Sequence, residues 1–140
     1  MRLLHALSLL TLGLVVSANN SPKELHIKTT YEPTDCKIKA KKGDAIKVHY
    51  TGKLFSNDNK FDSSHDRGQP LPLTLGVGQV IRGWDEGLVG MCIGEKRTLT
   101  IPSDMAYGQR GFGSIIPANS ALIFDVELVD LTSKSNHQEL

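Results

Sequence analysis

The segment Gly76-Val-Gly-Gln-Val-Ile-Arg-Gly-Trp-Asp-Glu-Gly-Leu-Val-Gly90 contains Trp84, which is the only tryptophan of the chain. Its larger apolar residues recur at helical spacing and fall on one arc of a helix: Val80, Ile81, Trp84 and Leu88. Three charged residues fall on the opposite side: Arg82, Asp85 and Glu86. The segment therefore predicts a short helix with one apolar face.

Gly83 and Gly87 lie one helical turn apart beside this apolar arc. Each interior glycine costs a helix roughly 1 kcal/mol relative to alanine, so a helix this short needs tertiary packing. The missing side chains let the helix lie close to a sheet. Trp84 is then either a core residue or part of a ligand site, in which the first-turn N–H groups of Val80 and Ile81 donate to a ligand carbonyl.

Residues 1–18 have the features of a secretory signal peptide. Met1-Arg2 gives a charged start, the run from Leu3 to Val16 is apolar, and small residues permit cleavage after Ala18. The apolar run is shorter than a membrane-spanning helix requires. Cleavage would remove 18 of the 140 residues, and the remainder is long enough to bury one core. We expect one domain over residues 25–131, without a membrane span in the mature chain.

The charge of the chain excludes some classes of partner. The formal net charge is +1 at pH 7, and loss of Arg2 with the signal peptide brings it to zero. A neutral domain is not typical of proteins whose main partner is nucleic acid or an anionic membrane. The five histidines lack metal-ligand spacing, and there is no EF-hand loop, nucleophile elbow or Walker loop. The sequence therefore predicts neither a metal site nor a cofactor.

Two cysteines, Cys36 and Cys92, remain after the signal peptide. In an oxidising compartment an even number of cysteines favours a disulfide, and the alternative is a pair of free buried thiols. A disulfide would link the basic, polar connection from Thr34 to Gly43 to the end of the Trp84 helix. Asn19-Asn20-Ser21 is an N-glycosylation sequon at the predicted mature N-terminus.

Alternation of apolar and polar residues predicts strands on both sides of the helix. The segment from Leu25 to Thr30 fits an edge strand, and the clearest strand runs from Ala121 to Leu131. Three further runs alternate in the same way: Ile46, Val48 and Tyr50; Leu71, Leu73 and Leu75; Arg97, Leu99 and Ile101. Gly52 is expected to end the regular part of the second strand. The pattern predicts an α+β domain, an antiparallel sheet of five or six strands with the helix on one face.

The segment from Pro102 to Ser120 forms a long loop with four large apolar residues: Tyr107, Phe112, Ile115 and Ile116. Long ordered loops in compact domains are usually functional. The alternative is that these side chains fold the loop onto the core.

The polar tail from Thr132 ends in His137-Gln138-Glu139-Leu140. This ending resembles the retrieval tetrapeptides of the Lys/His-Asp-Glu-Leu type, although Gln138 replaces the usual aspartate. The alternative is a chance ending.

Seven stretches, taken together and in order, resemble the FKBP family of peptidyl-prolyl isomerases: Val48-His49-Tyr50-Thr51-Gly52, Phe61-Asp62-Ser63-Ser64, Gly78-Gln79-Val80-Ile81-Arg82-Gly83-Trp84-Asp85, Ile101-Pro102-Ser103, Ala106-Tyr107-Gly108, Ile116-Pro117 and Leu122-Ile123-Phe124-Asp125-Val126-Glu127-Leu128. The match extends from about Gly43 to Leu131. Each stretch alone is weak evidence, whereas the ordered set is specific. The signal peptide, the two cysteines and the tail resemble the endoplasmic-reticulum branch of that family.

The resemblance implies a twisted antiparallel sheet of five or six strands wrapped around one short helix, with an apolar pocket between them. It implies ligand-binding roles for Tyr50, Phe61, Asp62, Arg67, Leu71, Gln79, Val80, Ile81, Trp84, Tyr107, Phe112, Ile115, Ile116 and Phe124. Trp84 would form the pocket floor, while the Ile81 N–H and the Tyr107 hydroxyl would donate to a bound carbonyl. Phe112, Ile115 and Ile116 would line a flap. The expected catalytic residues are Phe61, Asp62 and Tyr107.

The function implied by the resemblance is isomerisation of X-Pro bonds in proline-containing polypeptides, in the lumen of the endoplasmic reticulum. A monomer that also binds the macrolides tacrolimus and rapamycin is expected. No acid, base or nucleophile is assigned, and Asp62 has an electrostatic and orienting role. Leu71 stands where the family commonly has an aromatic wall residue, and the loop between Tyr50 and Phe61 is one residue longer than in small cytosolic members. Both departures bear on ligand affinity more than on activity.

Two other classes of function compete with the enzyme. One is a non-catalytic module or chaperone that holds proline-containing segments, and the other is a purely structural secreted domain. All of the pocket residues that the resemblance implies are present together, and this favours the enzyme.

Overall fold

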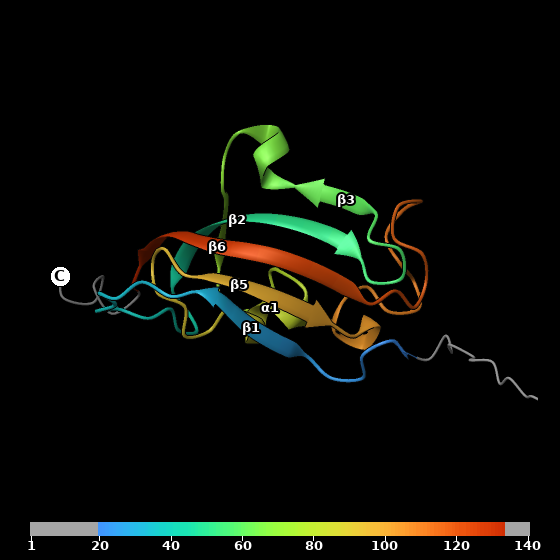
Figure 1. Cartoon of the computed structure of the whole chain (residues 1–140), viewed down its shortest axis with the longest axis horizontal. Coiled ribbons are helices and arrows are strands. Elements are labelled where there is room, and N and C mark those ends of the chain that lie inside the picture. The colour runs from blue at the N-terminus through green and yellow to red at the C-terminus, as the bar shows by residue number, and fades with distance from the viewer. Residues whose placement is uncertain (1–19, 134–140) are drawn as a thin grey trace, which may run out of the picture.

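The structure is a computed structural model that describes residues 20–133 (Figure 1). The predicted signal peptide, the first residue of the sequon and the C-terminal tetrapeptide lie outside the described residues, so these three remain predictions. The elements in chain order are β1 (His26–Tyr31), β2 (Ala45–Leu54), β3 (Lys60–Ser63), the 3₁₀ helix η2 (Ser64–Arg67), β4 (Leu71–Thr74), α1 (Arg82–Gly87), β5 (Lys96–Ile101), the 3₁₀ helix η3 (Ser103–Met105) and β6 (Leu122–Thr132).

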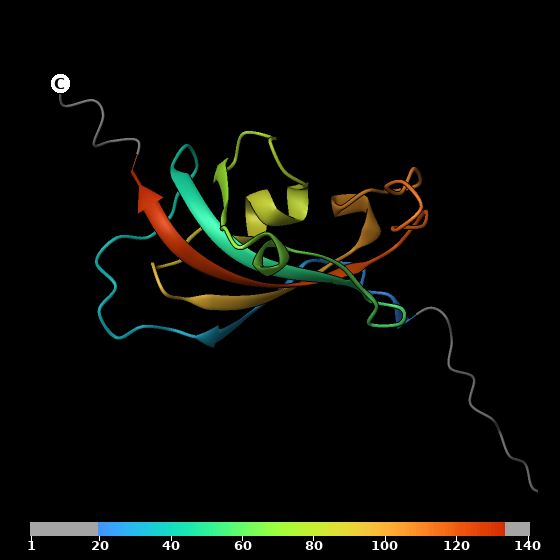
Figure 2. The same cartoon turned by 90° about the horizontal axis from the view of Figure 1, so that it is seen from above.

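The strands form one six-stranded antiparallel sheet in the order β1-β5-β6-β2-β3. Strand β4 pairs with the first part of β2, from Ala45 to Val48, whereas β3 pairs with a later part of β2, from Thr51 to Lys53. The long strands β2 and β6 form the centre of the sheet, and β1 is an edge strand as predicted. Figure 2 shows that the sheet curves around α1, which lies on its concave face. The predicted α+β architecture is therefore confirmed.

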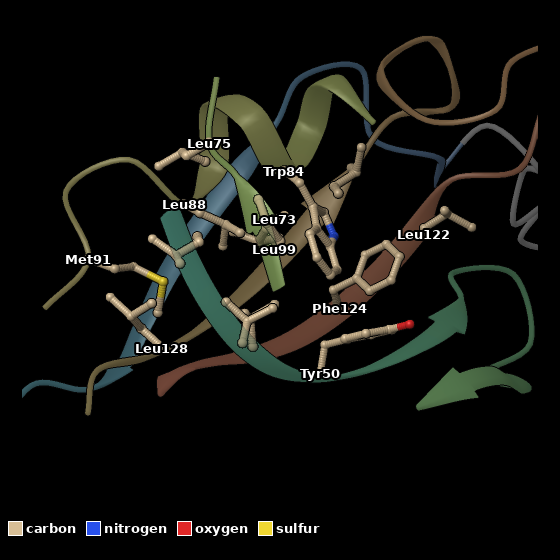
Figure 3. Close-up of a cluster of buried hydrophobic side chains, with 14 of the residues drawn as sticks. Tyr50, Leu73, Leu75, Trp84, Leu88, Met91, Leu99, Leu122, Phe124 and Leu128 are labelled. Carbon is tan, nitrogen blue, oxygen red and sulfur yellow. The ribbon is translucent and has the colours of Figure 1, made fainter. Parts of the chain in front are cut away.

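The core lies between the concave face and α1 (Figure 3). Alternate residues of the two central strands point into it and are at most 7% exposed: Ile46, Val48, Tyr50 and Leu54 of β2, and Leu122, Phe124, Val126 and Leu128 of β6. This is the period-two pattern that predicted the two strands. Burial of one face of each central strand fixes the register of the sheet.

The two glycines of α1 allow close packing on β5, as the sequence predicted. A Cβ atom on Gly83 would come within 2.5 Å of the Ile101 side chain, and one on Gly87 within 3.0 Å of Leu99. Real Cβ atoms do not approach other atoms as closely as 2.5 Å, so only glycine fits at position 83. The helix thereby lies close enough to the sheet for Trp84 to reach the core.

The prediction that Val80 and Ile81 form the first turn of the helix was wrong. The helix begins at Arg82, and Ile81 is its N-cap, with φ −59° and ψ 151°. The Ile81 carbonyl accepts the N–H groups of Trp84 and Asp85, at 2.9 and 3.1 Å. Val80 and Ile81 therefore approach the helix in a non-helical conformation.

The reason lies in the turn before the helix. Gly76 and Gly78 both have positive φ angles, 80° and 81°, which glycine adopts without strain. The Asp85 carboxylate accepts both glycine N–H groups at 2.8 Å. Helix residue Asp85 thus holds the preceding segment as a turn, and this contact competes with an earlier helix start.

Strand β2 continues past Gly52 to Leu54, and its pairing with β3 becomes irregular between Gly52 and Lys53, where the regular part of the strand was expected to end. A Cβ atom at position 52 would lie 2.6 Å from the Phe124 ring and 2.8 Å from the Phe61 ring. Glycine is required here because two aromatic rings cover the strand, rather than because the chain turns.

The loop from Pro102 to Ser120 contains both apolar residues that fold onto the core and apolar residues that are exposed. Ile116 is 3% exposed and belongs to the core, and Phe112 and Ile116 pair through two backbone hydrogen bonds of 2.8 and 3.1 Å. In contrast, Phe112 and Ile115 are 55% and 50% exposed. Some of its apolar residues therefore hold the loop on the domain, and others face solvent.

Cys36 and Cys92 form a disulfide with a Cα–Cα distance of 5.6 Å, as predicted. The Cys92 N–H donates to Glu95 at 2.9 Å, and Glu95 accepts from Arg97 at 2.7 Å. The Arg97 guanidinium also donates to the Gly87 carbonyl at 2.8 Å, at the end of α1. The disulfide, a buried ion pair and the C-terminal end of α1 are thus directly connected.

Candidate functional site

An apolar pocket of about 380 Å³ opens between α1, the concave face of the sheet and the 102–120 loop. Ten residues line it: Tyr50, Phe61, Asp62, Leu71, Gln79, Val80, Ile81, Trp84, Tyr107 and Phe124. Its size and its mostly apolar wall with a few polar groups are typical of small-molecule and peptide sites.

Several aromatic rings of the pocket lining meet edge to face, and Figure 3 shows the rings of Tyr50, Trp84 and Phe124 together. The centroid of Trp84 lies 5.0 Å from that of Tyr50 and 5.2 Å from that of Phe124, with interplanar angles of 79° and 84°. The ring centroids of Phe61 and Phe124 are 5.7 Å apart, with an interplanar angle of 88°. Edge-to-face contacts are favourable for aromatic pairs. Trp84 is only 4% exposed, so it belongs both to the core and to the pocket wall.

A β-bulge brings both Phe61 and Asp62 to the pocket. Asp62 pairs with Gly52, whereas the next pair joins Lys60 to Lys53, so Phe61 is the extra residue of β3. Neighbouring residues of a regular strand point to opposite faces, and a bulge relaxes this constraint. Phe61 and Asp62 accordingly both line the pocket.

Tyr50, Asp62 and Arg67 form a closed hydrogen-bonding network at the pocket wall. The Tyr50 hydroxyl donates to Asp62, and the Arg67 guanidinium donates to Asp62 and to the Tyr50 oxygen, both at 2.8 Å. Burial would raise the pKa of Asp62, but the hydrogen bonds from Tyr50 and Arg67 outweigh it and hold the pKa below its usual value. Asp62 is therefore ionised at neutral pH.

The pocket lining includes two donors that the resemblance implies for a bound carbonyl, the Ile81 N–H and the Tyr107 hydroxyl. Among residues 20–133 no acceptor receives the Ile81 N–H, which lies in the pocket wall just before α1. The Tyr107 hydroxyl is the second, and burial together with the negative charge of Asp62 raises its pKa. Tyr107 thus keeps its proton at neutral pH and can donate it in a hydrogen bond.

The family model for FKBP-type peptidyl-prolyl cis-trans isomerases matches residues 36–129. The chain belongs to this family. The match covers every residue that lines the pocket, from Tyr50 to Phe124.

Curated relatives of this FKBP-type isomerase cover nearly the whole chain. FK506-binding protein 2 of Dictyostelium discoideum is 53% identical over 133 residues, which are 94% of this chain and 99% of that protein. Peptidyl-prolyl cis-trans isomerase FPR2 of Saccharomyces cerevisiae is 51% identical over 119 residues, 85% of this chain and 88% of that protein. These relatives and the family match identify the chain as a peptidyl-prolyl isomerase.

A solved structure described as the crystal structure of AtFKBP13 is similar to the structure of this chain. It has a TM-score of 0.71 and 42% sequence identity, and the alignment covers 80% of this chain and 96% of that structure. The six-stranded antiparallel sheet with its short helix is thus the FKBP fold.

The FKBP pocket brings together ten of the fourteen residues expected to bind ligand. Arg67 is outside the lining and acts on it through Asp62 and Tyr50. Phe112 and Ile115 are also outside the lining and exposed, although the Phe112 ring lies 5.2 Å from that of Tyr107. Ile116 is buried in the core, although its bridge partner Phe112 is exposed. The roles of all fourteen residues remain predictions.

Sequence reasoning assigned no role to Ser64, which the structure places behind the pocket wall. Ser64 is fully buried, and its hydroxyl accepts the Tyr50 N–H at 2.8 Å and contacts His49 Nδ1 at 2.8 Å. The residue holds β2 against the start of η2, and so keeps Tyr50 close to Arg67. The Ser63-Ser64 pair was visible in the sequence, but nothing local indicated its burial.

The low pKa of Asp62 predicts a flat pH profile for isomerisation between pH 5 and 8. Since the folded pKa lies below the unfolded value of about 3.9, ionised Asp62 contributes stability that is present above that value and lost as the pH falls through the folded pKa. Activity should decline only below about pH 4, as the network with Tyr50 and Arg67 loses its charge. Isomerisation is measured against pH for the wild type and Asp62→Asn. A decline between pH 5 and 7 that Asp62→Asn abolishes would contradict the assignment.

Within residues 20–133, no helix is both long and apolar enough to cross a membrane. The same residues contain no group of three or more His, Cys, Asp or Glu side chains placed to hold a metal ion.

Proposed function

We propose that this isomerase accelerates the folding of proline-containing proteins in the secretory pathway, by binding the X-Pro segment in the aromatic pocket without covalent catalysis. The composition of the pocket supports this mechanism. Its lining includes no serine, threonine, cysteine, histidine or lysine among the described residues. Asp62 is the one carboxylate there, and its lowered pKa makes it a poor proton donor at neutral pH.

The chemistry of the amide makes such a pocket sufficient. Rotation about an X-Pro bond crosses a barrier of about 18–20 kcal/mol, because resonance keeps the amide planar. The planar amide has more charge separation than the twisted amide. A dry, apolar environment disfavours that charge separation, so the rings of Trp84, Phe61 and Phe124 would stabilise the twisted state relative to the planar one.

The polar groups of the pocket would orient the substrate. The Ile81 N–H and the Tyr107 hydroxyl would hold carbonyls of the flanking client chain while the bond rotates. Asp62, fixed by Tyr50 and Arg67, supplies a negative charge beside the bound carbonyl region and keeps the Tyr50 ring in place. It acts electrostatically and does not transfer a proton.

The same pocket is proposed to bind the macrolides tacrolimus and rapamycin. The names of several relatives state that those proteins bind FK506, and the pocket wall is apolar and open to solvent. Leu71, half-buried in β4, gives this wall an aliphatic side chain where the family commonly has an aromatic ring. The smaller contact should weaken macrolide binding more than isomerisation.

A peptide assay tests the proposed activity. The purified protein should accelerate cis-to-trans isomerisation of a short X-Pro peptide, and rapamycin should abolish the acceleration by filling the pocket. Leu71→Phe should strengthen inhibition while leaving turnover nearly unchanged. Binding of rapamycin without any acceleration of the peptide would identify a non-catalytic proline-binding module instead.

We further propose that the protein resides in the lumen of the endoplasmic reticulum. The disulfide fits an oxidising compartment. The predicted signal peptide would direct the chain into the secretory pathway, and the retrieval ending would return it to the endoplasmic reticulum. Deletion of residues 137–140 should send the protein into the medium, because the retrieval receptor would lose its signal. Immunoblotting of medium and cell lysate measures this. Equal secretion of the full-length and truncated proteins would mean that Gln138 disables the motif.

A further inference from the structure

The C-terminal end of α1 is bonded to a side chain of β5. A helix leaves its last carbonyl groups without partners inside the helix. The Arg97 guanidinium donates through Nη1 to the Gly87 carbonyl at 2.8 Å and to the Val89 carbonyl just beyond the helix at 2.9 Å. The last turn of α1 has no basic residue of its own. Arg97 therefore supplies the positive charge that stabilises a helix C-terminus.

Arg97 is itself oriented by a buried carboxylate. Its Nε donates to Glu95 at 2.7 Å, and the side chains of Arg97 and Glu95 are 12% and 3% exposed. Glu95 also accepts the Cys92 N–H at 2.9 Å and the Thr29 hydroxyl at 3.1 Å. Burial would raise the pKa of Glu95, but the hydrogen bonds from Arg97 and Cys92 outweigh it and hold the pKa below its usual value. A charged carboxylate thus holds the guanidinium toward α1.

The inward-facing residues of β5 follow α1 along its length. Ile101 lies against Gly83 and Leu99 against Gly87, and Arg97 is the next residue on this face of the strand. Two residues of a strand extend roughly 6.6 Å and four residues of a helix about 6 Å, so each inward residue meets the next turn. Apolar contacts are non-directional, whereas hydrogen bonds require a defined geometry. Arg97 therefore fixes where along β5 the helix lies.

Trp84 has no side-chain hydrogen bond that would fix its ring independently of the helix. Its Nε1 atom is buried and has no hydrogen-bond partner among residues 20–133. The indole points from α1 toward the sheet, beside the Phe124 ring (Figure 3), and it also contacts Tyr50 edge to face. Trp84 lies about one helical turn before Gly87. Movement of the helix end would consequently move the indole that is expected to form the pocket floor.

Net stability does not account for the pair of Glu95 and Arg97. Two charges lose their hydration when they are buried, and replacement of such a pair by apolar residues of similar volume is often neutral or stabilising. The hydrogen bonds of the pair do, however, define one position for the end of α1. The arrangement is therefore better explained by the placement of the helix than by the stability of the fold.

We propose that Arg97, oriented by Glu95, is a positioning residue for isomerisation, because it fixes α1 on the sheet and thereby the depth of Trp84 in the pocket. This inference rests on the proposed binding of the X-Pro segment in the aromatic pocket. Neither Arg97 nor Glu95 lines the pocket, so their effect on the reaction passes through α1. A misplacement of about 1 Å can lower a rate about 100-fold, so a small displacement of the floor is sufficient.

Two sets of substitutions separate the position of α1 from the stability of the fold. Arg97→Lys keeps a positive charge beside Glu95, but its side chain ends one bond short of Nη1 and loses the carbonyls of α1. Arg97→Met with Glu95→Gln removes both charges together, so neither remains buried without its partner. The matched control is Arg82→Met with Glu86→Gln, which removes an exposed ion pair of 2.9 Å from the same helix. Neither control residue lines the pocket.

Isomerisation of an X-Pro peptide and the fluorescence of Trp84 are measured at a temperature at which urea unfolding shows every variant to be folded. Trp84 is the only tryptophan, so the emission reports its surroundings directly. Arg97→Lys should lower kcat/KM about threefold, and Arg97→Met with Glu95→Gln about tenfold, each with a shifted emission maximum. The control should change kcat/KM less than about twofold and leave the emission unchanged, because exposed ion pairs contribute little.

Three outcomes would overturn the proposal: wild-type kcat/KM with unchanged emission in the folded Arg97 variants, a shifted emission with wild-type kcat/KM, or equal losses of activity in the control. If Arg97→Met with Glu95→Gln does not fold, the same criteria apply to Arg97→Lys alone. A wild-type protein that fails to accelerate the peptide would refute the proposed function separately. The emission of Trp84 in the variants would then still decide whether Arg97 positions the helix.

Discussion

Replacing Phe61 by alanine together with Asp62 by valine is expected to reduce kcat/KM for an X-Pro peptide about 100-fold, while the protein still unfolds cooperatively. The two side chains reach one pocket only because Phe61 is the extra residue of a β-bulge. Phe61 supplies part of the dry wall, and Asp62 orients Tyr50 and faces the bound carbonyl. The double variant removes the apolar surface and the oriented charge at once.

The stability of the variant should fall less than its activity. Truncation of a fully buried phenylalanine costs roughly 3–5 kcal/mol, but Phe61 is only half-buried in a pocket wall, so its cost should be lower. In Asp62→Val, Arg67 can still donate to the Tyr50 oxygen at 2.8 Å, so that hydroxyl keeps a partner. Thermal unfolding and peptide isomerisation are measured on both single variants and on the double variant.

Phe55→Ala with Asp66→Val provides a matched control. Phe55 is half-buried like Phe61, Asp66 has an ion pair with Lys60 at 3.1 Å, and neither residue lines the pocket. The control should lose stability but keep its activity. Wild-type turnover in a folded Phe61→Ala, Asp62→Val protein would rule out the site, and loss of fold in Phe61→Ala alone would favour a structural role for the phenylalanine.

Removal of the disulfide by Cys36→Ala with Cys92→Ala is expected to lower the free energy of unfolding by as much as about 4 kcal/mol. The cysteines are separated by 56 positions, and closure of a loop of that length restricts the unfolded chain by about this amount in the chain-entropy model. Urea unfolding of the oxidised wild type, the reduced wild type and the double variant measures the effect.

Isomerase activity should separate this effect from damage to the pocket. Neither cysteine lines the pocket, so the folded double variant should keep nearly wild-type turnover at low temperature. Mass spectrometry of native protein from the secretory pathway should find no free thiol. Two free thiols in the non-reduced protein, or equal stability of oxidised and reduced forms, would contradict the prediction.

Much of the fold follows from the sequence because the relevant signals are local. Apolar residues at every second position of β2 and β6, such as Val48 and Phe124, indicate which face of each strand is buried. The glycines at positions 83 and 87 indicate close packing, and the structure places Ile101 and Leu99 against them. The disulfide followed from an even cysteine count behind a predicted signal peptide.

Most of the pocket was also predictable, although by resemblance rather than by physical derivation. The ordered motifs placed Tyr50, Trp84 and Tyr107 in one site, and the structure brings them to one cavity. Periodicity alone left Trp84 with two interpretations. In the structure Trp84 belongs to the hydrophobic core and also lines the pocket, and its role in binding a ligand stays a prediction.

Contacts between distant residues decided what the sequence left open. Helix α1 begins at Arg82 because the Asp85 side chain holds Gly76 and Gly78 in a turn. Position 52 in β2 has room only for glycine, because rings from β3 and β6 lie where a side chain would be. Ile116 is buried while Ile115 is exposed, although the two are identical neighbours in the sequence.

The sequence by itself therefore determined which residues are apolar, at what period they recur and which motifs they form. Where a helix starts, which strand has an extra residue and which loop side chain is covered were decided only by the tertiary structure. The physical reason is that a short stretch of sequence defines its own preferred conformation and apolar face. The space available to a side chain, and the groups that satisfy its polar atoms, come from other segments of the chain.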